Sequence, residues 1–77
     1  MRFIDYRNKL VRLHQLINRK GTGDPAALAR RLDISRASVF RYLNDLKDMG
    51  ADIRYCKNRQ SYQYEDNNTP DFKGEGI

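Results

Sequence analysis

Arginine is the side chain in this sequence of 77 residues whose abundance points to a chemical role. Fifteen Lys and Arg stand against ten Asp and Glu, which gives a net charge of +5 at pH 7, and ten of the fifteen cations are Arg. Because the planar guanidinium donates paired hydrogen bonds to phosphate oxygens and to guanine edges, this excess favours a polyanionic partner. The alternative is a basic surface that only keeps the protein in solution.

The charge is unevenly placed along the chain. Residues 1–64 hold fourteen basic and six acidic side chains, or +8, whereas residues 65–77 hold Lys73 against four carboxylates, or −3. The last segment also lacks hydrophobic periodicity. We therefore predict a basic domain over residues 1–64 and an acidic C-terminal tail over residues 65–77.

Residues able to support catalysis or bind a metal are few. Cys56 and His14 are the single cysteine and the single histidine, too few for a structural zinc site. His14 lies on an apolar helical stripe, so a packed histidine is the expected role, and Asp45 and Asp48 share a helix face without a pocket or metal partner. The glycine-rich residues 21–24 lack the ending of a phosphate loop. We expect no enzymatic activity, cofactor or metal.

Periodicity of three and four residues predicts a first helix over residues 4–19. Its cations Arg7, Arg12 and Arg19 lie off the apolar stripe. Glycines at 21 and 23 end this helix, and Asp24 followed by Pro25 begins a second, short one. The stripe of the first helix consists of Phe3, Tyr6, Leu10, Leu13, His14 and Ile17.

A third helix is predicted over residues 36–48, with Ser35 as its N-terminal cap. At 100° per residue its apolar side chains fall within a narrow arc, and Ala37, Arg41 and Asn44 lie on the opposite side, with Ser38 and Phe40 on the flanks. This helix therefore has a small, basic outward surface. The inward arc holds Val39, Leu43 and Leu46.

Two short alternating segments follow, at residues 53–56 and 61–64. The turn-prone residues between them include Lys57 and Arg59, so the pair predicts a β-hairpin with a basic tip. The whole order predicts a mainly α fold with a small β-hairpin: a winged helix-turn-helix, that is, a three-helix core plus a wing.

The run from Asp24 to Leu43 resembles the helix-turn-helix of DeoR-type bacterial regulators, with Ser38, Val39 and Arg41 at the positions where that pattern has Ser/Thr, an aliphatic residue and Arg. The wing is similar to that of domains preceding a WYL ligand-sensing module, and the positions that carry this likeness are Leu46, Gly50, Ile53, Tyr55, Tyr62 and Tyr64. Departures from these patterns occur at Ala27, Cys56 and Ser61.

The resemblance implies that the third helix enters the DNA major groove. We expect major-groove contacts from Arg36, Ala37, Ser38 and Arg41. We expect DNA-backbone or wing contacts from Thr22, Ser35, Lys57 and Arg59. Structural roles are the alternatives: a helix cap for Thr22 and Ser35, a solvated face or a pair with Asp45 for Arg36 and Arg41, a local backbone bond for Ser38, and a charged, solvated loop for Lys57 and Arg59.

The expected function is sequence-specific binding of double-stranded DNA by a small cytoplasmic transcriptional regulator, without a membrane span and without a small-molecule effector domain. The alternative is a winged-helix adaptor that binds a polymerase, a recombinase or another regulator. Because one recognition helix reads only a few base pairs, a homodimer is expected through the N-terminal helix. The apolar residues proposed for that contact are Phe3, Ile4, Val11 and Leu16.

Overall fold

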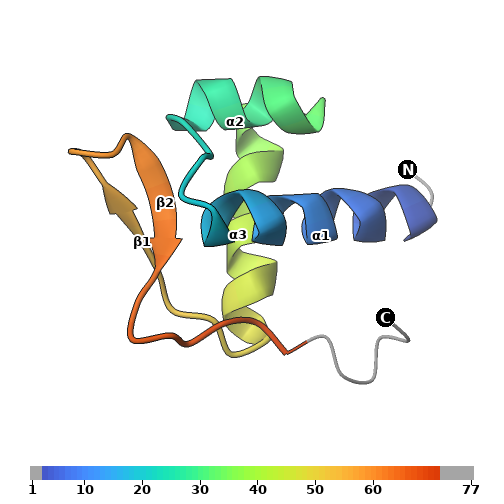
Figure 1. Cartoon of the computed structure of the whole chain (residues 1–77). Coiled ribbons are helices and arrows are strands. Elements are labelled where there is room, and N and C mark those ends of the chain that lie inside the picture. The colour runs from blue at the N-terminus through green and yellow to red at the C-terminus, as the bar shows by residue number, and fades with distance from the viewer. Residues whose placement is uncertain (1–2, 72–77) are drawn as a thin grey trace.

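The computed structural model describes residues 3–71. Its elements are α1 (Phe3–Asn18), α2 (Pro25–Leu32), α3 (Arg36–Asp48), β1 (Ile53–Cys56) and β2 (Ser61–Tyr64). In Figure 1, α1 crosses in front of α3, α2 lies by the N-terminal end of α3, and the two-stranded sheet flanks the helices. This arrangement confirms the predicted three-helix core with a β-hairpin wing. No helix within residues 3–71 is long and apolar enough to cross a membrane.

The core forms where the apolar sides of the three helices meet. The predicted inward arc of α3 is confirmed, and Tyr42 is buried beside it. Leu16 is only 4% exposed, so its expected part in a dimer contact is wrong. α2 and the hairpin cover more of α1 than its six-residue stripe suggests. The buried apolar residues are Leu10, Leu13, Leu16, Ile17, Leu28, Ala29, Leu32, Val39, Tyr42, Leu43, Leu46, Ala51 and Tyr62.

Side-chain caps fix the two helices on either side of the tight turn. The Asp24 carboxylate accepts a hydrogen bond of 2.8 Å from the backbone N–H of Ala27, and the Ser35 hydroxyl accepts one of 3.1 Å from the N–H of Ser38. Between the helices, Asp33 adopts a left-handed conformation with φ 56°. Aspartate tolerates this region better than most residues, so the chain turns from α2 into α3 within three residues, 33–35.

The wing is an antiparallel hairpin whose apolar side packs on the core. Ile53 pairs with Tyr64 and Tyr55 with Tyr62, which places all four on the same face of the sheet. The Tyr55 and Tyr62 rings meet edge to face with their centroids 5.0 Å apart. The turn of residues 57–60 between the strands is exposed, as predicted.

The segment after β2 stays with the domain. The N–H of Glu65 donates to the carbonyl of Asp52 over 2.9 Å, and the N–H of Asp71 donates to the carbonyl of Met49 over 2.9 Å. Pro70 is buried. Residues 65–71 therefore pack against the end of α3 and the start of β1, and the domain boundary at residue 64 stays a prediction. The remainder of the predicted tail, residues 72–77, lies outside the described residues.

Candidate nucleic-acid interface

The outward side of α3 gathers the residues predicted to contact the major groove. Arg36, Ala37 and Arg41 are exposed, as is Asn44, and Ser38 is half-buried. The apolar side of the same helix is held in the core, so these five residues have a fixed orientation toward solvent. The structure thus places the four predicted groove residues on one rigid helix, while their contact with DNA stays a prediction.

Arg41 does not form an ion pair with Asp45, the carboxylate one turn later in α3. Asp45 instead accepts a hydrogen bond from the hydroxyl of Tyr6 on α1. Burial, together with this bond, raises the pKa of Tyr6, so its hydroxyl keeps its proton. The Tyr6 ring also meets Tyr42 edge to face, with centroids 5.1 Å apart. Within residues 3–71 Arg41 has no ion pair, and its guanidinium is available to a ligand.

Ser35 and Ser38 form a small hydroxyl pair at the N-terminus of α3. The Ser35 hydroxyl donates to the Ser38 hydroxyl over 3.0 Å while it caps the helix. The capping role is therefore realised for Ser35. The hydroxyl proton of Ser38 has no acceptor within the described part of the chain, so it can be donated to a ligand at this helix end.

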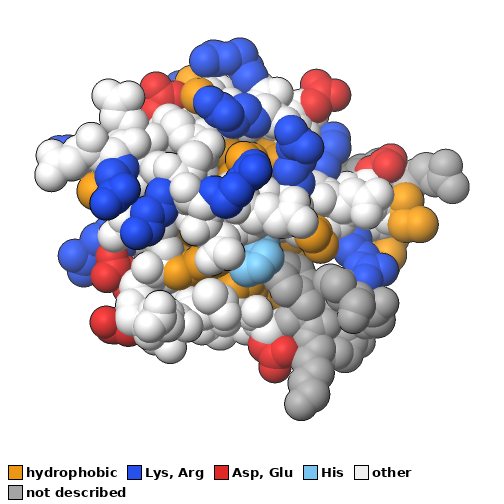
Figure 2. All heavy atoms as spheres, in the orientation of Figure 1, with side chains coloured by type: hydrophobic (Ala, Val, Ile, Leu, Met, Phe, Trp, Pro, Cys, Tyr) orange, Lys and Arg blue, Asp and Glu red, His pale blue; other side chains and the backbone are white. Residues whose placement is uncertain are grey.

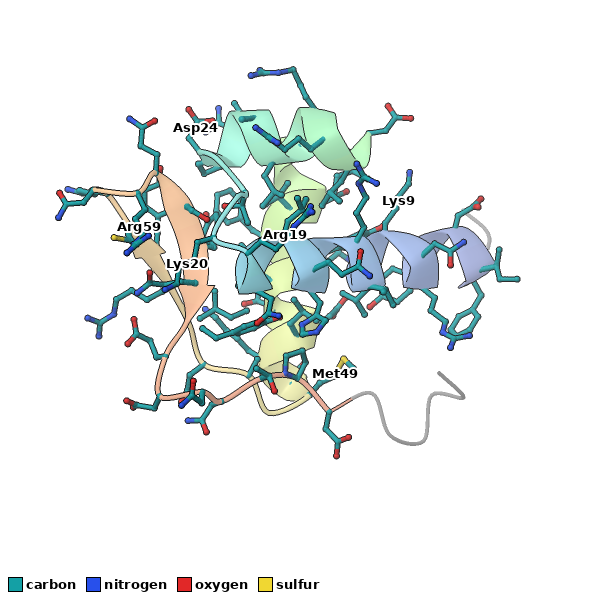
Figure 3. The ribbon with its side chains drawn as sticks, viewed as in Figure 1. Lys9, Arg19, Lys20, Asp24, Met49 and Arg59 are labelled. Atoms are coloured by element: carbon teal, nitrogen blue, oxygen red, sulfur yellow. The ribbon has the colours of Figure 1, made fainter. Side chains whose placement is uncertain are left out.

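Lys57 and Arg59 project from the tip of the wing. Both are exposed, and Figure 3 places Arg59 on the hairpin, away from the helical core. The turn is closed by a hydrogen bond of 3.3 Å from the N–H of Gln60 to the carbonyl of Lys57. Among residues 3–71 the ion pair that the structure shows is Arg54 with Glu65, at 3.5 Å, so neither tip cation is paired.

Thr22 does not agree with its predicted role. Its side chain is 0% exposed, so it cannot contact a DNA phosphate, and Asp24 rather than Thr22 caps α2. The Thr22 hydroxyl accepts a hydrogen bond of 2.8 Å from the N–H of Tyr62 and donates to the carbonyl of Gly23 over 2.9 Å. Thr22 therefore joins the turn after α1 to the wing.

Ser61 is the hydrogen-bond partner of Thr22, a contact that the sequence did not predict. It is 1% exposed, and its hydroxyl accepts a hydrogen bond of 3.1 Å from the N–H of Thr22 and donates to the carbonyl of Tyr62 over 2.8 Å. Ser61 is one of the positions where the sequence departs from the wing pattern that it resembles, and that departure was the available signal. We call Thr22, Ser61 and Tyr62 the wing base.

His14 joins α1 to the wing at a second point. Its Nδ1 lies 2.7 Å from the hydroxyl of Tyr64, and burial lowers the pKa of His14 while burial raises that of Tyr64. A neutral imidazole and a protonated tyrosine therefore share this hydrogen bond, which confirms the predicted packed histidine. Cys56 is half-buried, and no group of three or more possible metal ligands occurs among the residues described.

Three helices, a tight turn before an exposed polar helix, and a β-hairpin on the core define a winged helix-turn-helix domain. The sequence profile of the HTH domain family matches residues 8–63, and the chain belongs to this family of DNA-binding domains. No curated protein and no solved structure matches the chain at a significant level.

Proposed function

We propose that this chain is a sequence-specific double-stranded DNA-binding protein that acts as a small transcriptional regulator of the DeoR type. The observation that carries the proposal is the outward face of α3, whose Arg36 and Arg41 are exposed and unpaired within residues 3–71. A rigid helix with exposed Arg and small side chains fits the major groove, where guanine edges accept paired hydrogen bonds.

The large and the small side chains on the outward side of α3 have different roles in the proposed complex. Arg36 and Arg41 reach base edges or phosphates, and Ala37 lets the helix approach the groove floor closely. The Ser38 hydroxyl donates to a base or phosphate, with Ser35 beneath it holding the helix start. We call Arg36, Ala37, Ser38 and Arg41 the recognition face.

The wing supplies contacts without sequence information. Lys57 and Arg59 lie on a turn that the hairpin carries away from the core, so they meet the phosphate backbone or the adjacent minor groove when α3 is in the major groove. Because the wing base ties the hairpin to the turn after α1, these cations have a defined position relative to α3.

Selection of binding sites from random duplex DNA, with a salt titration of the selected site, tests the proposal. We expect one short preferred sequence, and an affinity that falls linearly with the logarithm of salt concentration. Recovery of duplexes without any shared sequence would contradict sequence-specific recognition. The same experiment with Arg36→Ala/Arg41→Ala is the control, and this variant should lose the preference.

A homodimer through α1 forms part of this proposal. A single module buries only about 600–1,000 Å² of protein surface on DNA, so two copies give the specificity that a regulator needs. At the start of α1, Phe3 is 68% and Ile4 is 59% exposed. Val11, about two turns further along α1, is half-buried. Sedimentation of the wild type and of Phe3→Ser/Ile4→Ser, free and bound to the selected site, tests this contact; a strict monomer in both states excludes it.

A protein-interaction adaptor is the second candidate, and Phe40 is the observation that favours it. This side chain is 47% exposed on the flank of α3, next to the recognition face. Exposed aromatic side chains are frequent anchors of protein interfaces. For an adaptor, the selection experiment enriches no sequence, and Phe40→Ser abolishes partner binding while Arg41→Ala leaves it intact.

A further inference from the structure

A second group of cations lies on the side of the molecule that α1 and α2 form together. Lys9, Arg12 and Arg31 line an open groove of about 750 Å³ between these helices. Arg19 comes directly after α1, and its N–H still donates to the carbonyl of Gln15 over 3.1 Å as in a helix, so the seven residues from Arg12, about two turns, put it on the same side. Figure 2 shows Lys and Arg side chains gathered over α1 and α2, and Figure 3 labels Lys9 and Arg19 there. We call these four residues the α1–α2 basic surface.

This surface faces away from the recognition face. α1 crosses in front of α3, and the buried sides of the two helices, with Leu13 on one and Val39 on the other, meet in the same core. The exposed side of α1 therefore points toward the viewer of Figure 1, and the exposed side of α3 points away. We therefore expect one straight duplex docked on α3 to leave the α1–α2 basic surface uncovered.

The arginines of this surface have no carboxylate partner within residues 3–71. Asp5 and Asp33 also line the groove, but neither forms an ion pair with a groove cation. Lys9 has a structural role, because its Nζ donates to the carbonyl of Asp33 at the end of α2 over 3.3 Å. Arg12 and Arg31, like Arg19 directly after α1, are exposed, and their charge is available to a ligand.

We propose that the α1–α2 basic surface binds the phosphate backbone of a second DNA duplex, so that one chain can hold two duplexes together. This inference rests on the proposed DNA binding by α3. From Arg12 to Arg19, the first residue after α1, the chain rises about 10 Å along the helix axis, at 1.5 Å per residue. Duplex DNA carries about six negative charges over such an interval, which suits a row of exposed arginines.

The composition of the groove favours DNA over an acidic protein. Its apolar lining residues are Val11, which is half-buried, and Leu32, which is 2% exposed. A stable protein interface needs an apolar centre that excludes water, and this groove has none to offer. Phosphate binding needs only exposed cations, so the second duplex is held without sequence preference and more weakly as salt rises.

A bridging assay tests the proposal. A duplex that carries the selected site is fixed on beads, protein is added below saturation and washed, and a fluorescent duplex of random sequence is then offered. We expect the wild type to retain the second duplex. We expect Arg12→Gln/Arg31→Gln to retain at least about tenfold less of the second duplex. The loss of two phosphate contacts lowers the slope of log affinity against log salt concentration for the second duplex by about two. The affinity of this variant for the first duplex should stay unchanged.

Two variants separate charge position from net charge and from folding. Arg30→Gln/Lys47→Gln removes the same charge from exposed positions outside the groove and should retain bridging. Arg12→Lys/Arg31→Lys keeps the charge and should also retain it, because phosphate binding does not need a guanidinium. Equal loss in the control and the groove variant would overturn the proposal.

The remaining outcomes each decide a different point. Wild type that binds the fixed duplex and retains no second duplex overturns this inference and leaves the proposed function in place. Wild type that binds neither duplex overturns both. If Arg12→Gln/Arg31→Gln bridges the two duplexes as well as the wild type, a dimer accounts for the bridging. If this variant instead loses affinity for the first duplex, the α1–α2 basic surface contacts the duplex that α3 binds. Both results overturn the inference.

Discussion

The recognition face and the wing base use similar side chains for opposite purposes. In the wing base, Thr22 and Ser61 are buried and exchange all their hydrogen bonds with the protein. On the recognition face, Ser38 and Arg41 keep donors without acceptors within residues 3–71. The residue type alone therefore does not separate a stabilising polar group from a binding one. Burial and the completeness of hydrogen bonding do.

The contrast has an energetic reason. An isolated two-stranded hairpin is barely stable in water, so the wing needs fixed attachment to the helices. The wing base provides it by satisfying the N–H of Tyr62 inside the protein, where a missing partner would be costly. The recognition face has no such need, because α3 is held by its buried side, and its outer donors can stay hydrated in the free protein.

The largest effect that tests this contrast is expected from Thr22→Val. The change keeps the side-chain shape and removes the hydroxyl, which leaves the buried N–H of Tyr62 without an acceptor. We expect the free energy of unfolding to fall by about 3 kcal/mol, measured by chemical denaturation. Thr69→Val at an exposed position is the matched control and should change it by less than about 0.5 kcal/mol. Equal stability of the two variants would show that the hydrogen bonds of the wing base do not stabilise the attachment of the wing.

Arg41→Ala should give the next largest effect, on binding and not on folding. We expect a loss of about 1–3 kcal/mol at the preferred site and a relaxed preference at one base position, since Arg41 reads a base edge in the proposed complex. Lys47→Ala, on the last turn of the same helix, is the control and should keep the preference. A uniform loss over all sequences would move Arg41 from base recognition to phosphate contact.

The helices and strands were largely predictable because their apolar residues repeat at the spacing of each element. In α3 the inward arc of Val39, Leu43 and Leu46 also fixes which residues face outward, so one pattern predicted both the buried and the exposed side of this helix. Leu16 was assigned wrongly, because the width of the buried stripe on α1 depends on how far α2 and the wing wrap around it.

The wing base was not predictable from the same pattern. Thr22 stands between two glycines and meets Ser61, 39 residues later, only once the hairpin has packed on the helices. A hydroxyl side chain gives no periodic signal, and a threonine before a helix suggests a cap. The attachment of residues 65–71 was missed for a related reason, since it is made largely by backbone hydrogen bonds, such as that of Asp71 to Met49.

Arg59→Ala should give a smaller effect than the changes at Thr22 and Arg41. In the proposed complex this wing cation contacts phosphate, so its loss should weaken binding to all sequences alike and lower the salt slope by about 1. Asn58→Ala, an uncharged change in the same turn, is the control. A loss of affinity that depends on the DNA sequence would show that the wing reads bases. The wing and the recognition face would then both contribute to sequence recognition.

The smallest expected effect is the pH dependence that His14 gives to the attachment of the wing. Burial lowers the pKa of His14 below its ordinary value of 6.5, so the unfolded chain takes up a proton more readily than the folded domain does. The stability is therefore fully present above pH 6.5 and is lost as the pH falls from there through the lower pKa of the folded state. We expect the melting temperature to fall slightly more between pH 7.5 and 5.5 for the wild type than for His14→Gln, which does not titrate. Carboxylates titrate mostly below this window, so the difference between the two proteins reports His14. Parallel melting curves would show that the wing is held by Thr22 and Ser61 without any contribution from the neutral imidazole and the Tyr64 hydroxyl.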